Sequence, residues 1–123
     1  LLIAMSGATT GKSSISDFDG KAYLNQRVGL FRSITTKLEY QFLIQFVFSH
    51  MFFRQLGAVL VAGAQPNISP KEIQNFKLNF PIIEEQKKIA DFLSAIDKKI
   101  DTTSTQIDKT KEFKKGLLQQ MFV

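Results

Sequence analysis

The chain of 123 residues carries a formal net charge of +5, and 44% of its residues are hydrophobic, which is typical of one domain large enough to bury a core. It has no cysteine, which excludes a disulfide scaffold, a thiol nucleophile and thiolate metal sites. Its most apolar stretch, residues 40–53, is too short and too interrupted to span a bilayer, and no signal peptide is visible, so we expect a soluble, cytoplasmic protein.

The positive charge is concentrated in the first two thirds of the chain. Residues 1–83 carry eight basic and four acidic side chains, a net charge of +4, whereas residues 84–123 carry eight basic and seven acidic ones, a net charge of +1. Basic side chains that neutralise phosphates release condensed counterions, so this excess is compatible with a polyanionic partner. Taken alone, the charge distribution is explained better by ordinary solvated lysines than by a surface that binds a polyanion.

The first third of the sequence predicts β-structure. Residues 1–6, 21–25 and 28–34 have the pattern of strands, and clusters of Gly and Asp separate them. Because the chain opens on Leu1 within a strand pattern rather than on a methionine, we expect it to be part of a longer protein.

A glycine loop, SGATTGKSS at residues 6–14, has the outline of a phosphate-binding P-loop. Three residues separate Gly7 from Gly11, whereas the Walker A pattern requires four, and the turn-forming sequence ISDFDG stands where a helix should begin. The spacing therefore favours a hairpin loop that carries Lys12. The alternative, a P-loop enzyme, would require tight nucleotide binding that Lys12→Ala abolishes.

A helix is predicted at residues 36–56. Gln41, Gln45 and Ser49 recur at four-residue spacing and form a narrow polar stripe, while apolar side chains cover nearly all the rest of the surface. Such a helix requires burial on more than one side, against a sheet and a second element or against a partner.

A short helix is predicted to begin at Pro70, because residues 69–72 form a capping box with proline at the first helical position. A loop at residues 63–67 precedes it. The alternation of residues 76–82 then predicts a strand, which Pro81 places at a sheet edge or at its own end.

One long helix is predicted from Glu84 onward, since no proline and a single glycine interrupt its good helix formers. At 1.5 Å per residue it is about 57 Å long. One face repeats at alternating steps of four and three residues, the heptad pattern of a coiled coil. We call this face the seam, and its positions are Ile89, Leu93, Ile96, Ile100, Thr103, Ile107, Thr110, Lys114, Leu117 and Met121.

The seam is too long to be buried on a domain of about eighty residues, so it requires a second helix. Thr103, Thr110 and Lys114 predict weaker pairing with a defined register, and tolerance of polar residues on a solvated helix is the alternative. We expect the seam to drive self-association, most simply as an antiparallel homodimer with two-fold symmetry.

Two parts of the sequence match a familiar pattern. Residues 63–122 read GAQPNISPKEIQNFKLNFPIIEEQKKIADFLSAIDKKIDTTSTQIDKTKEFKKGLLQQMF, and SGATTGKSSI and AYLNQRVG stand upstream. They resemble the specificity (S) subunit of type I restriction-modification enzymes over nearly the whole chain. The resemblance implies that residues 1–82 are the C-terminal part of a target-recognition domain and that residues 83–123 are its long conserved spacer helix.

The resemblance further implies a non-catalytic role in DNA sequence recognition. A complete subunit of this family carries two target-recognition domains, each reading one half of a split DNA target, and two antiparallel helices that space them. It holds modification subunits, which bind S-adenosylmethionine and methylate adenine, and restriction subunits with ATP-driven translocation join the full enzyme. The present chain would bind double-stranded DNA but no cofactor of its own, and it departs from the pattern by lacking the other half.

Candidate DNA contacts gather in the loops of the front part, where hydroxyls, amides and cations can bond phosphates or base edges. The candidates are Thr9, Thr10, Lys12, Ser13, Asn25, Gln26, Arg27, Gln65 and Asn67. Asn and Gln can bond adenine bidentately, and Arg can bond guanine in the same way. The alternative for Asn25, Gln26 and Asn67 is a local role at strand ends and turns.

Other chemistry is sparse in the sequence. His50 is the only histidine, so no metal site or histidine-based triad can be assembled, and Asp17 with Asp19 lacks a third ligand for calcium. We therefore expect an α+β fold, a small sheet with a buried apolar helix followed by a coiled-coil helix, and a function in DNA recognition. The alternative is a structural coiled-coil interaction module without DNA contact.

Overall fold

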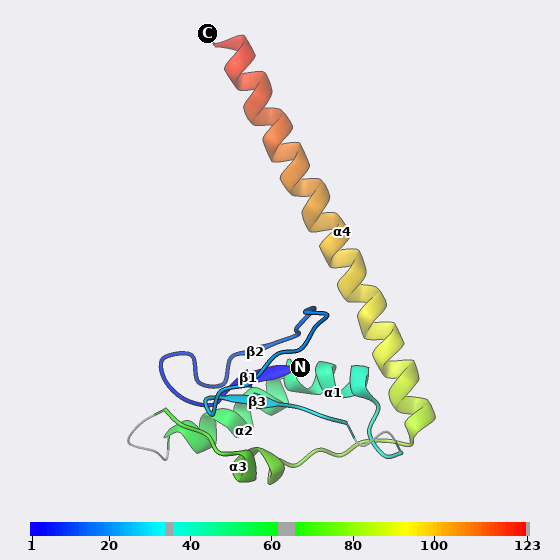
Figure 1. Ribbon diagram of the computed structural model, residues 1–123. Coiled ribbons are helices and arrows are strands. Elements are labelled where there is room, and N and C mark those ends of the chain that lie inside the picture. The colour runs from blue at the N-terminus through cyan, green and yellow to red at the C-terminus, as the bar shows by residue number, and fades with distance from the viewer. Residues whose placement is uncertain (34–35, 62–65, 123) are drawn as a thin grey trace.

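The computed structural model describes residues 1–33, 36–61 and 66–122. In these ranges three short strands precede four helices: β1 (Leu2–Ala4), β2 (Ser13–Ser14), β3 (Val28–Leu30), α1 (Tyr40–Val47), α2 (His50–Val61), α3 (Pro70–Gln74) and α4 (Ile83–Met121). The predicted α+β class is confirmed. The elements before α4 form one body, which we call the head, and α4 projects from it as a single rod (Figure 1).

The sheet has the order β2-β1-β3, and both neighbours pair antiparallel with β1. The loop between β1 and β2 is the hairpin predicted at residues 6–14. Gly7 and Gly11 have φ angles of 88° and 86°, left-handed values that glycine adopts without strain. The Gly11 N–H donates to the Ala4 carbonyl at 2.8 Å and closes the loop. A strand rather than a helix follows, so the arrangement of a P-loop is not formed here.

Gly11→Ala is expected to lower the free energy of unfolding by about 2 to 3 kcal/mol, because a side chain at this φ is strained and also collides with the core. A Cβ at Gly11 would lie 2.4 Å from Leu56 Cδ2, whereas a Cβ at Gly7 would meet nothing within 4 Å. Gly7→Ala is therefore the matched control, with an expected loss of about 1 kcal/mol from strain alone. Chemical denaturation measures both, and equal losses would contradict the packing argument.

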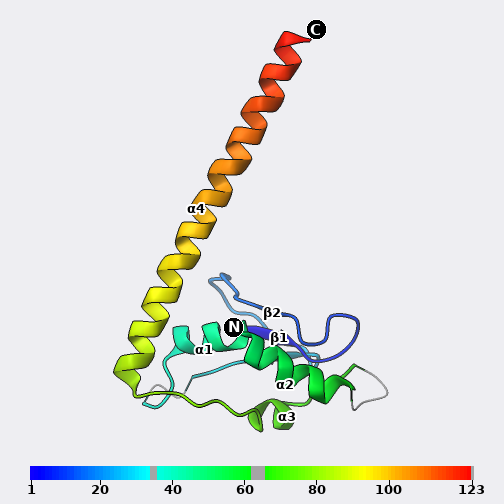
Figure 2. The same cartoon turned by 180° about the vertical axis from the view of Figure 1, so that it is seen from behind.

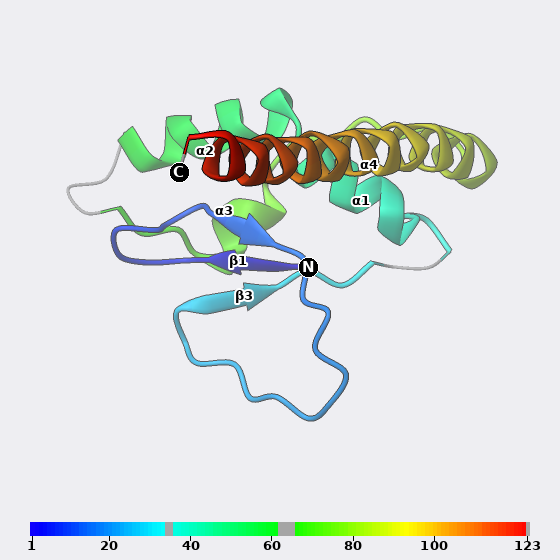
Figure 3. The same cartoon turned by 90° about the horizontal axis from the view of Figure 1, so that it is seen from above.

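The strand predicted at residues 21–25 is wrong. This segment lies in an irregular, exposed loop, residues 15–27, that extends away from the sheet (Figure 3). Both edges of the central strand β1 are already paired, with β2 and with β3. No edge of β1 is therefore left with which residues 21–25 could pair. The strand predicted at residues 28–34 is confirmed as β3 for Val28–Leu30, residues 31–33 do not belong to a strand, and residue 34 lies outside the described residues.

The single helix predicted at residues 36–56 is also wrong, because two helices, α1 and α2, meet there at an angle of 57°. α1 ends at its C-cap, Phe48, and the Ser49 hydroxyl then accepts a hydrogen bond from the Phe52 N–H at 3.3 Å. Ser49, which the helical pattern placed in a polar stripe, thus caps the start of the second helix. The bend lets both helices press apolar side chains onto the same core.

The core of the head is centred on Phe52, which is 1% exposed. Its ring makes edge-to-face contacts, with centroids 5.4 to 6.1 Å apart, to Phe31, Phe46, Phe53 and Phe76. The other buried members are Leu1, Ile3, Leu43, Ile44, Val47, Leu56 and Ile68. Within the described ranges no single helix is long and apolar enough to cross a membrane, although the bent pair α1 and α2 passes that test of length and composition together.

The short helix α3 begins at Pro70 as predicted, and its capping box is present. The Ser69 hydroxyl accepts from the Glu72 N–H at 3.3 Å, and the Ser69 N–H donates to the Glu72 carboxylate at 2.7 Å. The hydrogen bonds that Ser69 donates lower the pKa of Glu72. This cap fixes the direction in which the chain leaves the loop before α3.

The strand predicted at residues 76–82 is wrong, since these residues form a connector without strand pairing. The side chain of Gln55 on α2 bonds the Lys77 backbone twice: Nε2 donates to the carbonyl at 3.0 Å, and Oε1 accepts from the N–H at 2.6 Å. A side chain therefore satisfies the backbone groups that a neighbouring strand would have used.

The long helix α4 is confirmed, and it starts one residue before the predicted Glu84. Its first turns pack against α1, where Gln86 and Ala90 are buried, and nearly every residue after Asp97 is exposed. Figure 2 shows from behind the place where α1 and α4 meet, and the rod rising away from the head beyond it. The rod is therefore held at one end only.

Candidate nucleic-acid interface

The strand directions bring most of the candidate DNA contacts to one end of the sheet. β1 runs toward Ser6, where the hairpin loop turns back, and β3 begins at the same end because it is antiparallel to β1. Asn67 adds a bridge to Ser6. Residues 6–12, 25–27 and 66–69 thus meet, and we call them the tip (left end of the sheet in Figure 3).

A hollow of about 630 Å³ opens in the tip. The side chains that line it include three of the candidates, Gln26, Arg27 and Asn67, together with the serines Ser6 and Ser69. This set combines a guanidinium group, two amides and the Ser6 hydroxyl, while the Ser69 hydroxyl is already engaged with Glu72 in the capping box. These are the donors and acceptors with which proteins bond phosphates and base edges.

Hydrogen bonds hold the three segments of the tip together. The Thr10 hydroxyl donates to the Pro66 carbonyl at 2.5 Å, which joins the hairpin loop to the segment before α3. The Met5 N–H donates to the Arg27 carbonyl at 2.8 Å, and the Met5 carbonyl accepts from the Ile68 N–H at 2.9 Å. The candidate Thr10 therefore positions the loop, and its hydroxyl is already engaged.

Asn25 has the local role that the sequence left open as an alternative. Its Oδ1 accepts from the Arg27 N–H at 2.9 Å, and its carbonyl accepts from the Val28 N–H at 3.2 Å. The amide oxygen closes a turn of the kind that asparagine favours. This turn presents Arg27 beside the hollow.

The remaining candidates divide between the loop surface and the sheet. Thr9 and Lys12 are exposed on the hairpin loop, outside the residues that line the hollow. Ser13 is half-buried in β2, and within the described part of the chain its buried Oγ has no hydrogen-bond partner. Gln65 lies outside the described residues.

The tip is positively charged by sequence. Its segments contain Lys12 and Arg27 and no Asp or Glu, and both cations are exposed. The charge excess found in the first two thirds of the chain thus has two members at this end of the sheet. Asp17 and Asp19 lie farther along the loop of residues 15–27, and the Glu72 carboxylate bonds Ser69, so the excess of positive charge is confined to the three segments themselves. Two exposed cations in these segments are compatible with an anionic partner.

The tip shows no metal-binding chemistry. Among residues 1–33, 36–61 and 66–122, no group of three or more His, Cys, Asp and Glu side chains could hold a metal ion. His50, the only histidine, is exposed at the start of α2.

The rod presents the predicted seam to solvent beyond the joint. Ile89 and Leu93 are half-buried near the head, whereas Ile100 is 59% and Ile107 50% exposed. The expectation that the head cannot bury the whole seam is confirmed. A shallow, mostly apolar groove along the rod is lined by Ile96, Lys99, Ile100, Thr103, Ser104 and Ile107.

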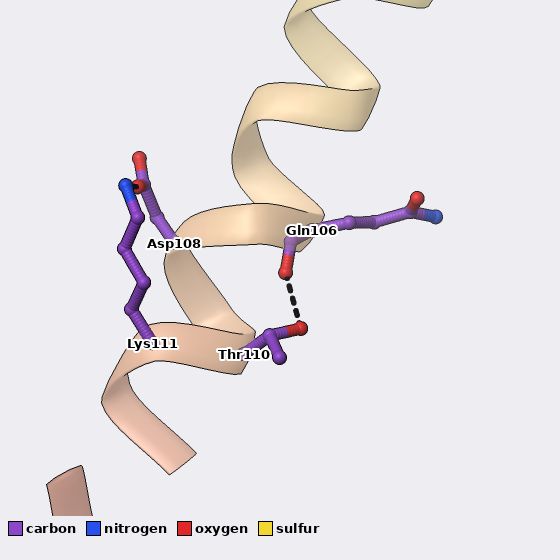
Figure 4. A network of polar contacts seen from close by, with 4 residues as sticks. All are labelled: Gln106, Asp108, Thr110 and Lys111. Carbon is purple, nitrogen blue, oxygen red and sulfur yellow. Dashed lines mark hydrogen bonds and ion pairs between the residues drawn. The ribbon is translucent and has the colours of Figure 1, made fainter. Parts of the chain in front are cut away.

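The threonines of the seam satisfy their hydroxyls within α4. Thr103 Oγ1 donates at 2.8 Å to the carbonyl four residues earlier, and Thr110 Oγ1 donates at 2.8 Å to the Gln106 carbonyl (Figure 4). Neither hydroxyl therefore requires a polar partner on a facing helix. Nearby, Lys111 Nζ and Asp108 Oδ1 form an exposed ion pair at 2.9 Å, which contributes little to stability.

Comparison with known proteins identifies the family of this chain. The family model described as the type I restriction modification DNA specificity domain matches residues 1–112, which include the tip and most of α4. The chain belongs to this family. No solved structure matches this specificity domain at a significant level.

Two relatives of the specificity domain come from Methanocaldococcus jannaschii. The specificity subunit of the type I restriction enzyme MjaVIII is 33% identical over 104 residues, which are 85% of this chain and 24% of the relative. A specificity subunit named for the type I restriction enzyme MjaX is 36% identical over 58 residues, which are 47% of this chain and 14% of that relative. The specificity domain thus spans about a quarter or less of these relatives.

The sequence pattern did not single out one residue of the specificity domain that the structure places at the centre of the joint. Gln86 is 0% exposed although it lies at the end of the first turn of a highly charged helix. A glutamine among Glu84, Glu85 and Lys87 has the pattern of a solvated face, and the small Ala90 one turn later is the only hint of close packing. Only the three-dimensional structure identifies Gln86 as buried.

Proposed function

We propose that this specificity domain reads one half of a split DNA target with its tip and is spaced from a second DNA-reading domain by α4. The observation that carries the proposal is the convergence of three loops, remote in sequence, around a hollow lined by Gln26, Arg27 and Asn67. The names of the relatives, specificity subunits of type I restriction enzymes, support it.

In this proposal the residues of the tip have different tasks. Lys12 and Arg27 neutralise phosphates, while Gln26 and Asn67 bond base edges. Thr9 supplies a hydroxyl to the DNA backbone. Thr10 and Asn25 hold the loops in place through the bonds already described.

The rod has the mechanical task. A helix that is paired along its seam is stiff, and its length sets the separation of two DNA-reading domains, with about 5.4 Å for each additional turn. The partner of the seam is a second helix of the same kind, which for the isolated chain is a second copy in an antiparallel homodimer.

The chemistry belongs to other subunits in this proposal. Modification subunits dock along α4, bind S-adenosylmethionine and methylate adenine, and restriction subunits with ATP-driven activity join them. The specificity domain itself is not an enzyme and requires no metal or cofactor. Its contribution is the choice of DNA sequence, in the cytoplasm, for subunits that cannot make that choice themselves.

The proposal predicts salt-dependent binding to duplex DNA. The logarithm of the affinity for a mixed-sequence duplex should fall linearly with the logarithm of the salt concentration, with a slope of about 0.9 for each phosphate neutralised. Lys12→Ala should lower that slope by about 0.9 and weaken binding, and Arg27→Ala should do the same. Fluorescence anisotropy of labelled DNA over a salt series measures the slope.

The matched control is Lys109→Ala, which removes an exposed cation on α4, away from the tip. It should leave the slope unchanged. Absence of salt-dependent binding in the unmodified chain would overturn the proposal and favour the alternative, a coiled-coil interaction module without DNA contact. Tight binding of a nucleotide that Lys12→Ala abolishes would instead favour a P-loop enzyme.

A further inference from the structure

The joint between head and rod is built around a buried amide. Gln86 Oε1 accepts from the Glu39 N–H at 2.9 Å, and Gln86 Nε2 donates to the Lys37 carbonyl at 3.0 Å and to the Pro81 carbonyl at 2.8 Å. Both hydrogens of the amide and its oxygen are therefore engaged. They bond the chain just before α1 and the chain just before α4, so one side chain on the rod ties together the starts of two helices.

Two further contacts lie on the same side of the rod. Ala90, 1% exposed, follows Gln86 by one turn and lets α1 approach closely, and Gln45 Nε2 on α1 donates to Asp97 Oδ2 at 2.9 Å. At about 100° per residue, positions 86, 90 and 97 project within about 40° of one another. The three contacts therefore form a line along one face of α4. A line of contacts fixes the direction of the helix axis relative to the head, whereas a single contact would fix only one point on it.

We propose that Gln86 is a positioning residue that sets the angle at which the rod leaves the head. The amide is suited to this task because it is buried and directional: each of its bonds weakens steeply as the helix tilts or rotates. The Gln45–Asp97 bond is exposed and adds little. Apolar packing at Ala90 holds the helices together, but such packing is non-directional and tolerates small rotations.

This angle matters for DNA recognition, a consequence that rests on the proposed function. The free part of the rod, Lys98 to Met121, is about 36 Å long. A tilt of about 10° at the joint would therefore move its far end by about 6 Å, close to two base pairs at 3.4 Å each. A loose joint would make the distance between two DNA-reading domains variable even if the tip and the seam remained intact.

The test measures the angle directly and uses no DNA. The chain contains no cysteine, so Ser14→Cys on the sheet and Lys109→Cys on the rod provide two unique sites for spin labels, both exposed. Pulsed electron paramagnetic resonance then gives the distribution of distances between the labels. Labelled chains are diluted in unlabelled ones so that only distances within one chain contribute.

Gln86→Met keeps the length of the side chain and removes all three hydrogen bonds. We expect it to widen the distance distribution at least twofold while the helical circular dichroism signal is retained. Gln86→Glu should widen it similarly, because a carboxylate cannot donate to the Lys37 and Pro81 carbonyls. The control Asp97→Asn keeps an acceptor for Gln45 and should leave the distribution unchanged. An unchanged distribution in folded Gln86→Met would overturn the proposal.

A second measurement needs no variant at Gln86 and covers the case in which the variants fail to fold. The Glu39 N–H should exchange with solvent at least 100-fold more slowly than in an unstructured peptide, because its acceptor is a buried amide. Exchange at the peptide rate would overturn the proposal. Since neither measurement involves DNA, a failure of the proposed DNA binding would leave both results standing, and the reverse also holds.

Discussion

A chain that carries both Ile100→Lys and Ile107→Lys is expected to remain monomeric at concentrations at which the unmodified chain self-associates. Both isoleucines lie on the exposed part of the seam, 59% and 50% exposed. Burying each in a helix pair contributes about 1.5 to 3 kcal/mol, so losing both should weaken association by at least roughly 10² to 10⁴-fold. Sedimentation equilibrium measures the dissociation constant of the two chains.

The matched control adds the same two charges on the opposite face of the rod. Thr102→Lys with Thr105→Lys changes two exposed residues that do not belong to the seam, and self-association should persist. If the isoleucine variant associated as tightly as the unmodified chain, the seam would not be the contact surface. A monomeric unmodified chain at tens of micromolar would argue against the homodimer itself.

Phe52→Ala is expected to cost about 3 to 5 kcal/mol of the free energy of unfolding and to leave the head largely unfolded at physiological temperature. Phe52 is 1% exposed and contacts four other phenylalanine rings. Removing its ring leaves a cavity that the surrounding rings cannot fill without leaving their own positions. Denaturant unfolding, followed by the aromatic and helical signals, measures the loss.

Phe48→Ala is the control for this substitution, because Phe48 is 45% exposed and ends α1. It removes the same atoms from a site that is already partly hydrated, so the loss should stay below about 1.5 kcal/mol. Equal losses for the two variants would show that the core is not centred on Phe52. DNA binding should fail in the Phe52 variant together with folding and should persist in the control.

Elements that depend on local signals could be predicted from the sequence. The capping box before Pro70, the glycine spacing of the hairpin and the heptad pattern of α4 each act through neighbours within a few residues. The α+β class followed from the change of pattern along the chain. Tertiary contacts among the described residues do not override these local preferences, so the predicted elements form.

The errors in the predicted elements arose where a distant residue decides the outcome. The helical pattern at residues 36–56 is continuous, yet the chain bends at Ser49 because α1 and α2 both pack on the core that includes Ile3 and Ile68; the cap that Ser49 makes with the Phe52 N–H is itself local. The connector at residues 76–82 alternates like a strand, yet the Gln55 side chain bonds its backbone. Packing on distant residues and the bonds between Gln55 and Lys77 leave no trace in local periodicity.

The candidate site was predictable in kind but not in arrangement. Polar loop residues could be gathered as candidates from their chemistry, but the bridge between Ser6 and Asn67 joins segments about sixty residues apart. The strand order and this bridge together place Arg27 and Asn67 around one hollow. The local roles of Thr10 and Asn25 likewise depend on bonds that only the folded loops create.

The tip and the joint lie at opposite ends of the head (Figure 1). Mutations that alter the loops of the tip therefore leave Gln86 and its partners unchanged, and the angle at which α4 leaves the head stays the same. Under the proposed function, evolution can replace one DNA preference by another through changes in the loops. The distance between the two DNA-reading domains does not change with them. The head then joins two independent parts: a tip whose loops can vary, and an attachment to α4 that stays constant.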